Sequence, residues 1–257
     1  MKRTITLFLT VMIMPALFAL DFPIKQTIIS QYSGKVPTRW AEKLPGVKTR
    51  LDTGEKVIAL TFDACGSKND GYNAELIDFL VKEDVPATLF INARWIDKFP
   101  KQFDELASNK LFEIENHGLE HRPASVSGKS VYGIKGTESV GDLIDEVEGC
   151  ALKIEKLTGR KPVYYRSGTA YYDEVAVEVI KRLGYDIAGF SLLGDAGATY
   201  NEDKVKEVLL GAPAGSIVIF HMNHPEKSGT KDGIIEAVPI LKKNGYKFVK
   251  ISDYKLK

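Results

Sequence analysis

The chain has 257 residues, 44% of them hydrophobic, which is enough to enclose one sizeable core within a single domain. Its 35 Lys and Arg residues balance 34 Asp and Glu residues, so the formal net charge is only +1. No cluster of basic residues is visible that would neutralise phosphates, so we expect no nucleic acid as a partner and a weakly charged ligand instead.

The first segment has the composition of a secretory signal peptide. Lys2 and Arg3 precede an apolar run over residues 5–18, and Ala19 provides a small residue at the expected cleavage point. The run is too short to span a bilayer comfortably, so we expect a signal peptide over residues 1–19 and no stable membrane insertion after its cleavage. An uncleaved N-terminal anchor is the alternative. Both interpretations predict a periplasmic or secreted protein.

The two cysteines, Cys65 and Cys150, would then meet an oxidising compartment in which a disulfide can persist. A bridge of that span would stabilise the fold by about 4–5 kcal/mol in the loop-closure model. Cys150, however, lies on the apolar side of a predicted helix, which favours a buried free thiol equally. The sequence leaves both alternatives open.

Residues 20–55 show no clear periodicity and predict an irregular lead-in, whereas residues 56–257 alternate between short β-branched runs and amphipathic segments. Strands are predicted at 57–62, 87–91, 112–116, 163–165, 187–190, 217–220 and 247–251, and helices at 74–82, 101–108, 140–157, 174–183, 203–210 and 234–243. The alternation predicts an α/β fold with a parallel sheet, closed into a barrel rather than left as an open doubly wound sheet. No glycine-rich phosphate-binding turn follows the first strand, which argues against a nucleotide site.

Polar side chains follow the predicted strands at their carboxyl ends, the edge where barrels and parallel sheets place active sites. They are Asp63, His117, His121, Arg166, Asp195 and His221. Asp63 follows a buried strand, so it needs a partner; a general base paired with Arg166 is the functional interpretation, and a helix cap or a structural ion pair is the alternative.

The histidines among these residues have two interpretations each. His117 and His121 are four residues apart, which would place them on one side of a helical turn around a shared metal ion, or they are unrelated loop residues. His221 ends a buried strand and could act as a general acid oriented by Asp195, or it is a histidine at the edge of the core with Asp195 capping a turn.

These motifs, in this order, resemble the polysaccharide deacetylase family, the chitooligosaccharide deacetylase homologues of carbohydrate esterase family four. The resemblance extends from about residue 56 to residue 253. In the family, the first Asp of the opening motif is the base, two histidines bind the metal, and a closing histidine is the acid. The matching segments are Thr61-Phe62-Asp63, His117 with His121, residues 165–170 with Arg166 but without the usual prolines, Asp195 near the acidic motif, and Ile219-Phe220-His221.

The resemblance implies a distorted (β/α)7-type barrel in a single domain and a metal-dependent hydrolase that removes N-acetyl groups from a glycan such as peptidoglycan. The implied cofactor is a divalent metal, zinc first, with cobalt, nickel or manganese as alternatives. The backbone N–H of Thr169 is the implied donor to the oxyanion. Trp95, Tyr171 and Tyr172 could stack on sugar rings or serve as ordinary packing residues.

One position departs from the family pattern. The family usually has a second Asp directly after the base, which completes the metal site, and here that residue is Ala64. Asp70, a Cys65 thiolate or water could fill the vacancy, and we predict Asp70 or water. The rival functions are a degenerate domain that binds glycan without cleaving it, an O-acetyl esterase or another amidase on the same scaffold, and a cysteine hydrolase that uses Cys65 with His221.

Overall fold

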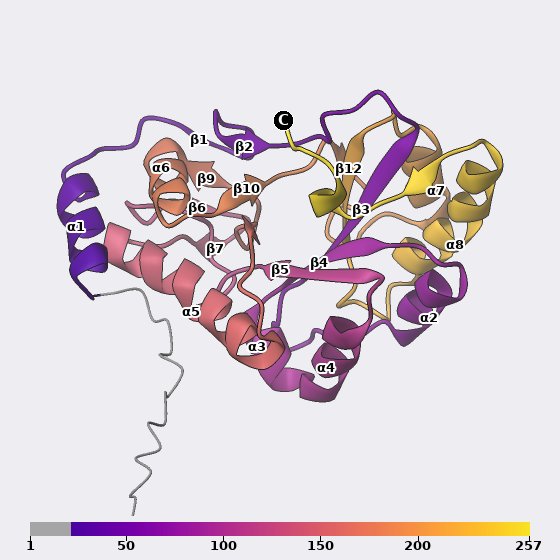
Figure 1. Ribbon diagram of the computed structural model, residues 1–257, viewed down its shortest axis with the longest axis horizontal. Helices are drawn as coiled ribbons and strands as arrows, with labels where there is room; N and C mark the ends of the chain where they lie inside the picture. Colours follow the sequence, from indigo (N-terminus) through magenta and orange to yellow (C-terminus); the bar gives the residue numbers. More distant parts are fainter. Residues whose placement is uncertain (1–21) are drawn as a thin grey trace, which may run out of the picture.

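The computed structural model describes residues 22–257, so the predicted signal peptide at residues 1–19 lies outside the described residues. Its centre is a curled nine-stranded sheet with the order β11-β12-β3-β4-β5-β8-β10-β2, in which β13 pairs with β3 (Figure 1). Every pairing in this sheet is parallel. The strands are β2 (Val47–Lys48), β3 (Val57–Ala64), β4 (Ala87–Ile91), β5 (Phe112–Asn116), β8 (Tyr164–Tyr165), β10 (Asp186–Ala188), β11 (Leu192–Leu193), β12 (Ser216–His221) and β13 (Lys247–Phe248).

This sheet confirms the predicted α/β fold and its distorted barrel. The edge strands β11 and β2 are not paired with each other within residues 22–257, so the sheet is a curled half-barrel rather than a closed cylinder. All the strands predicted from the sequence belong to it. Because its strands run parallel, their carboxyl ends lie along one edge, where the candidate residues gather.

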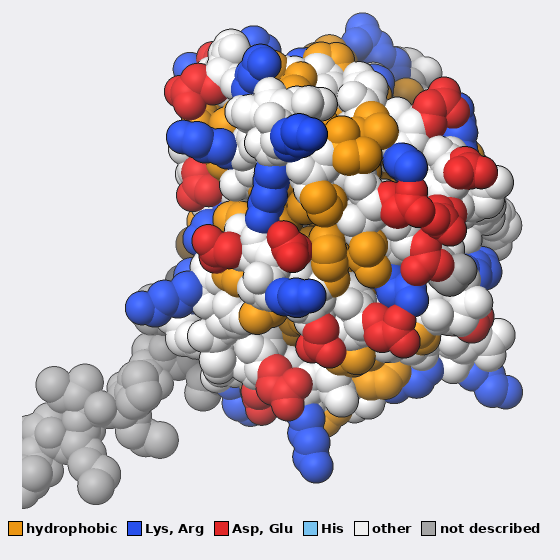
Figure 2. Space-filling model, turned by 90° about the vertical axis from the view of Figure 1, so that its right-hand side faces the viewer, with side chains coloured by type: hydrophobic (Ala, Val, Ile, Leu, Met, Phe, Trp, Pro, Cys, Tyr) orange, Lys and Arg blue, Asp and Glu red, His pale blue; other side chains and the backbone are white. Residues whose placement is uncertain are grey.

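Helices cover the outside of the sheet. Those that match predicted segments are α2 (Ala74–Lys82), α4 (Pro100–Ser108), α5 (Val140–Thr158), α6 (Glu174–Arg182), α7 (Glu202–Leu210) and α8 (Ser228–Lys243). The short helix α3 (Ala93–Lys98) and a 3-10 turn at Ile251–Asp253 were not predicted. Within residues 22–257, no helix has both the length and the apolar character needed to cross a membrane. On the side that carries α7 and α8, Lys and Arg are interspersed with Asp and Glu (Figure 2).

The segment predicted as an irregular lead-in is in fact an ordered part of the fold. It forms helix α1 (Phe22–Tyr32) and strands β1 (Trp40–Ala41) and β2. Helix α1 buries Ile28 and Tyr32 in the same apolar cluster as residues of α5 and α6, and β2 extends the sheet beside β10. The segment packs against the domain as expected, but α1, β1 and β2 are regular elements that the sequence did not reveal. Helix α1 was missed because packing against α5 and α6 stabilises it more than its own sequence does.

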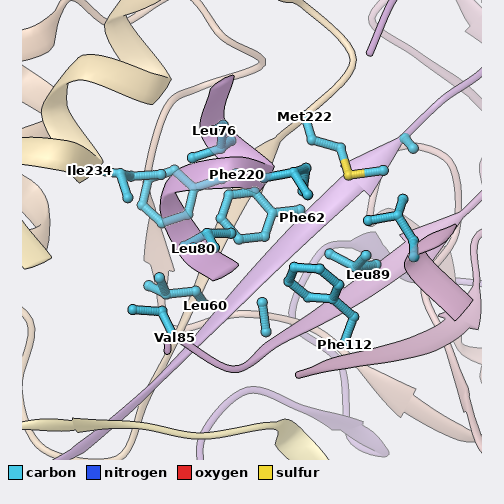
Figure 3. Close-up of a cluster of buried hydrophobic side chains, with 14 of the residues drawn as sticks. Leu60, Phe62, Leu76, Leu80, Val85, Leu89, Phe112, Phe220, Met222 and Ile234 are labelled. Atoms are coloured by element: carbon cyan, nitrogen blue, oxygen red, sulfur yellow. The ribbon is translucent and has the colours of Figure 1, made fainter. Parts of the chain in front are cut away.

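Strand β3 alternates between two environments. Ile58, Leu60, Phe62 and Ala64 belong to the apolar cluster between the sheet and its helices. Figure 3 shows Leu60 and Phe62 among side chains of α2 and α8. The odd-numbered residues point to the inner face, because side chains alternate along a strand. The inner face of β3 therefore presents Asp63 at the end of the strand.

Helix α5 has clear boundary signals. The Ser139 side chain accepts a hydrogen bond from the backbone N–H of Asp142 at its start, and Gly159 ends the helix in a left-handed conformation with φ of 71°. Its buried stripe includes Leu143, Val147 and, unexpectedly, a glutamate, Glu146. This helix packs behind β5 and the loop that follows it.

Candidate active site

Asp63 and Arg166 form a buried ion pair at the carboxyl edge of the sheet. An Nη atom of Arg166, which follows β8, donates to Asp63 Oδ1 at 2.8 Å. The other donors of Arg166 reach the Thr61 hydroxyl and the backbone carbonyls of Ala188 and Gly189. Both members of the pair are buried and hydrogen-bonded, so the guanidinium fixes the carboxylate in position.

His117 follows β5, and the backbone orients its imidazole. Its Nδ1 lies 2.9 Å from the carbonyl oxygen of Arg166. A carbonyl only accepts, so Nδ1 carries the proton and donates, which leaves the Nε2 lone pair free. Nε2 lies 3.5 Å from Asp63 Oδ2. Burial lowers the pKa of His117, so its ring is neutral near pH 7, the state in which imidazole binds metals.

His121 reaches the same point through a bent loop, not through the helical turn that its spacing predicted. Its backbone is left-handed, with φ of 61°. The ring centroids of His117 and His121 lie 4.8 Å apart. Burial, together with the neighbouring His117, holds the pKa of His121 well below its ordinary value. The two imidazoles therefore lie together as neutral rings, as expected if they share one metal ion.

Glu146 on α5 holds this loop in its bend. Its buried carboxylate accepts hydrogen bonds from the backbone N–H of Glu120 at 2.9 Å and of Arg122 at 3.1 Å. Gly118 lies so close that an added Cβ would be 2.3 Å from Glu146 Oε1. The sequence reasoning missed Glu146, although a carboxylate on the apolar stripe of a helix was a visible signal of a buried polar contact.

His221 and Asp195 form the second buried pair. His221 ends β12, and its Nδ1 donates to Asp195 Oδ1 at 2.9 Å. Oδ2 accepts from the His221 backbone N–H at 2.7 Å and from the Thr230 hydroxyl at 3.0 Å. Burial opposes the charge on both groups, but the pair and its hydrogen bonds lower the pKa of Asp195 and raise that of His221. His221 therefore keeps its proton to a higher pH than a free histidine.

Both pairs meet at one pocket of about 390 Å³, which Asp63, His121, Thr169 and His221 help to line. Its outer wall comes from two places: Tyr132, in the hairpin of β6 (Ser130–Val131) and β7 (Ile134–Lys135), and Glu42 in the segment predicted as lead-in. The pocket lies at the carboxyl edge of the sheet, where β3 ends near Asp63 and β12 ends at His221.

Thr169 lies in this wall with hydrogen-bonding capacity to spare. Its buried hydroxyl oxygen has no partner within the described part of the chain. The same is true of its backbone N–H, whereas the neighbouring N–H groups of Gly168 and Ala170 donate to the carbonyls of Arg122 and Ser167. A free backbone N–H in a pocket wall can stabilise a developing oxyanion, the role that the sequence resemblance implied.

The group that could hold a metal consists of Cys65, His117 and His121. One ligand atom from each lies within 4.8 Å of the others. Asp70, the predicted third ligand, is not part of this group. Its carboxylate accepts hydrogen bonds from the backbone N–H and the hydroxyl of Ser67, both at 2.6 Å, which hold it in the loop between β3 and α2. In this structure the Asp70 oxygens stabilise their own loop, and the prediction of Asp70 or water as the third ligand stays a prediction.

Two of the three aromatic residues considered for sugar stacking are buried packing residues. Trp95 and Tyr172 are inaccessible, and the Trp95 ring nitrogen donates to the carbonyl of Gly71. Tyr171 packs against Tyr132 on the hairpin that borders the pocket. Sequence position alone placed all three near the edge, but tertiary packing turns two of them inward.

Both cysteines are free, so the alternative of a disulfide is not realised. Cys150 is buried on α5, where its thiol donates to the carbonyl of Ile91. Burial raises the pKa of the Cys65 thiol well above its ordinary value, as does the nearby Asp63. The sulfur contacts His117 at 4.0 Å, whereas the rival cysteine hydrolase required His221 as its base. These surroundings do not activate Cys65 as a nucleophile.

The chain belongs to the polysaccharide deacetylase family, which it matches over residues 50–188. This range contains Asp63, His117, His121 and Arg166, and Asp195 and His221 follow it. The fold is that of carbohydrate esterase family 4, an α/β fold with a curled, distorted barrel.

Among similar proteins, the peptidoglycan-N-acetylglucosamine deacetylase of Bacillus cereus is 26% identical over 210 residues, which cover 80% of this chain and 92% of that protein. The peptidoglycan-N-acetylmuramic acid deacetylase PdaA of Bacillus subtilis is also 26% identical over 210 residues, covering 79% of this chain and 72% of PdaA. The PdaA structure has a TM-score of 0.66 at 23% identity and covers 89% of this chain and 87% of that one.

The same fold also occurs without catalysis. A family 4 pseudoenzyme from Bacillus anthracis has a TM-score of 0.67 at 20% identity, over 82% of this chain and 69% of that one. Structural likeness at this level of identity shows the fold alone. The activity of this chain must therefore be argued from its own side chains.

Proposed function

We propose that this chain is a metal-dependent hydrolase that removes N-acetyl groups from a glycan, with peptidoglycan as the first substrate to test. The observation that carries the proposal is the convergence of two buried pairs, Asp63 with Arg166 and His221 with Asp195, on one pocket beside His117 and His121. One pair suits a general base and the other a general acid. A domain that only binds glycan has no need of both.

The residues present fit a divalent metal. His117 and His121 are neutral, and the Nδ1 of His117 donates to a backbone carbonyl, which leaves Nε2 free to coordinate. When bound there, a divalent ion would lower the pKa of a coordinated water toward neutrality and polarise a carbonyl oxygen. We propose zinc as the physiological ion, with cobalt, nickel and manganese as alternatives.

The chain's own residues divide the remaining work. Asp63, held in position by Arg166, accepts the proton of the attacking water. The backbone N–H of Thr169 donates to the oxygen that becomes negatively charged as the amide carbonyl is attacked; one such donor typically contributes about 3–4 kcal/mol. His221, protonated beside Asp195, gives its proton to the nitrogen of the sugar as the carbon–nitrogen bond breaks. One water is consumed, and the products are acetate and a free amino sugar.

The choice of substrate rests on the relatives, two of which are named as peptidoglycan deacetylases. Their identity of 26% supports a glycan with N-acetylated sugars rather than one particular sugar. Location outside the cytoplasm follows from the proposed signal peptide. The mass of the protein recovered from a culture that expresses the full chain tests this point, because export with cleavage predicts a mature start near residue 20.

The direct test is release of acetate from peptidoglycan by purified mature protein, before and after treatment with a chelator and then with added zinc. We expect activity that the chelator abolishes and zinc restores. If no acetate is released from any N-acetylated glycan with any of the four metals, the domain that binds glycan without cleaving it replaces this proposal. Release from O-acetylated glycans alone would instead indicate an esterase.

A further inference from the structure

We infer that Cys65 is the third protein ligand of the metal site, so that this chain holds its ion with two imidazoles and one thiolate in place of the family's two histidines and aspartate. The inference deepens the proposed function and rests on it for the expectation that a metal binds. Its argument comes from the direction of the side chains on β3 and from the distances around Cys65.

The residue that departs from the family pattern, Ala64, points away from the site. It is fully buried in the apolar cluster between sheet and helices, together with Phe62, two residues earlier on the same strand. Because side chains alternate along a strand, the methyl group of Ala64 points into this cluster and not into the pocket. Ala64 is therefore a packing residue in this chain.

The next side chain on the inner face is Cys65. It lies directly beyond the end of β3, two residues after Asp63, and Asp63 already faces His117 across 3.5 Å. The Cys65 sulfur lies 4.0 Å from His117 Nε2. Cys65 thus takes the place of a third ligand, one residue after Ala64, where the family has its aspartate. It can do so because the strand ends there and the chain turns at Gly66 into the loop toward α2.

The distances suit a shared ion. Zinc bonds to sulfur and nitrogen of about 2.3 Å and 2.0 Å place the two ligand atoms about 3.6 Å apart in a tetrahedral site. The observed 4.0 Å between Sγ and Nε2 needs only a small side-chain rotation to reach that value. The ligand atom of His121 completes a group whose members all lie within 4.8 Å of one another. The fourth position stays open to water and substrate, as a catalytic site requires.

Thiolate coordination has a consequence for metal choice. Sulfur is a soft ligand that favours zinc and cobalt, whereas a carboxylate suits harder ions such as manganese and magnesium. We therefore expect this chain to discriminate against manganese and magnesium more strongly than a site with two histidines and an aspartate would.

The test uses the metal-free mature protein and cobalt, because a cobalt–thiolate bond gives a near-ultraviolet charge-transfer band that nitrogen and oxygen ligands do not give. In the wild type we expect this band to rise with cobalt and saturate at one equivalent. The variant Cys65→Ser should lose the band, and its affinity should fall by more than the roughly 10–100-fold that loss of an outer-shell partner costs. Cys150→Ser is the matched control, and it should keep both the band and the affinity.

Two further variants distinguish the effect of the ligand's position in the chain from the effect of its chemical type. Cys65→Asp should bind cobalt without the charge-transfer band, because a carboxylate then takes the place of the thiolate. Ala64→Asp in the Cys65→Ser background should not recover binding, and it should lower the melting temperature because it buries a carboxylate among apolar side chains.

Binding of one cobalt equivalent without the band in the wild type, or the same band in Cys65→Ser, would overturn the inference and leave the proposed deacetylase standing. No cobalt binding at all would also overturn it. If the band appears but no acetate is released, the inferred ligand set is right and the proposed deacetylase function is wrong.

Discussion

At the scale of single residues, one pocket brings together a carboxylate and an imidazole, each held by its own buried partner. Arg166 holds Asp63 by a hydrogen bond of 2.8 Å, and Asp195 holds His221 by one of 2.9 Å. The pKa of His221 is raised although burial opposes its charge, because Asp195 and, more weakly, Asp63 favour the protonated ring. The pocket therefore holds a carboxylate fixed by a guanidinium beside an imidazole whose protonated form is favoured.

The first prediction concerns Asp195→Asn. A general acid must be protonated, so activity falls as the pH rises through the pKa of His221. Removal of the Asp195 charge lowers that pKa, and the alkaline limb of the profile of kcat against pH should move to lower pH, with about a tenfold or greater loss of rate at alkaline pH.

The measurement is the full pH profile of this variant beside Asp203→Asn, which changes an exposed carboxylate on α7. Melting curves show whether the loss of a buried partner also weakens the fold. An alkaline limb that does not move in Asp195→Asn would contradict the assignment of His221 as the acid.

At the scale of elements, the loop after β5 that carries His117 and His121 is held in shape by two neighbouring elements. Helix α5 supplies the Glu146 carboxylate, which accepts N–H groups on both sides of His121. The loop after β8 supplies Gly168, where an added Cβ would lie 2.2 Å from the carbonyl carbon and oxygen of His121. The left-handed backbone of His121 is thus held between a helix and a glycine.

For the helix, we predict that Glu146→Gln weakens metal binding. The amide cannot accept through both of its polar groups, so at least one N–H of the loop loses a charged acceptor, at a cost of about 1.5–3 kcal/mol in stability. Calorimetric titration with zinc and a denaturant melt measure the two effects. Glu155→Gln on the same helix is the control, and equal zinc affinity in both variants would show that Glu146 does not position the loop.

For the glycine, we predict that Gly168→Ala displaces His121, because its contact is with backbone atoms that cannot rotate away. Overpacking of this kind typically costs about 1–3 kcal/mol. Zinc content and melting temperature should both fall. Gly34→Ala, where an added Cβ meets nothing within 4 Å, is the matched control and should change neither. A Gly168→Ala variant with full zinc content would contradict this account of the loop.

The elements also show what the sequence could predict. The strands Ala87–Ile91 and Phe112–Asn116 and the helix Ala74–Lys82 were placed to the residue, since short segments with apolar residues at strand spacing and a clear apolar stripe on the helix leave little choice. Helix α1 was missed because its stability comes from packing on α5 and α6. The bend at His117 and His121 was mistaken for a helical turn because its cause, Glu146, lies far along the chain.

At the scale of the whole molecule, the parallel sheet explains why the candidate residues could be found without a structure. Strands β3, β5, β8 and β12 all end at one edge, so the polar residues that follow them must meet there. The residue that we infer to be the third ligand could not be chosen in the same way. Asp70 and Cys65 both follow β3, and only the direction of their side chains, set by the end of the strand and by Ser67, distinguishes them.

The measurement that tests the central claim most directly is the mass of peptidoglycan fragments after incubation with the zinc-loaded protein, in the wild type and in Asp63→Asn. Loss of a general base typically costs about 10²–10⁴ in rate. We expect fragments that lack acetyl groups with the wild type and unchanged fragments with Asp63→Asn, at equal zinc content and equal melting temperature. Fragments deacetylated equally by both proteins would contradict the account, since the buried carboxylate at the centre of the site would then have no part in the reaction.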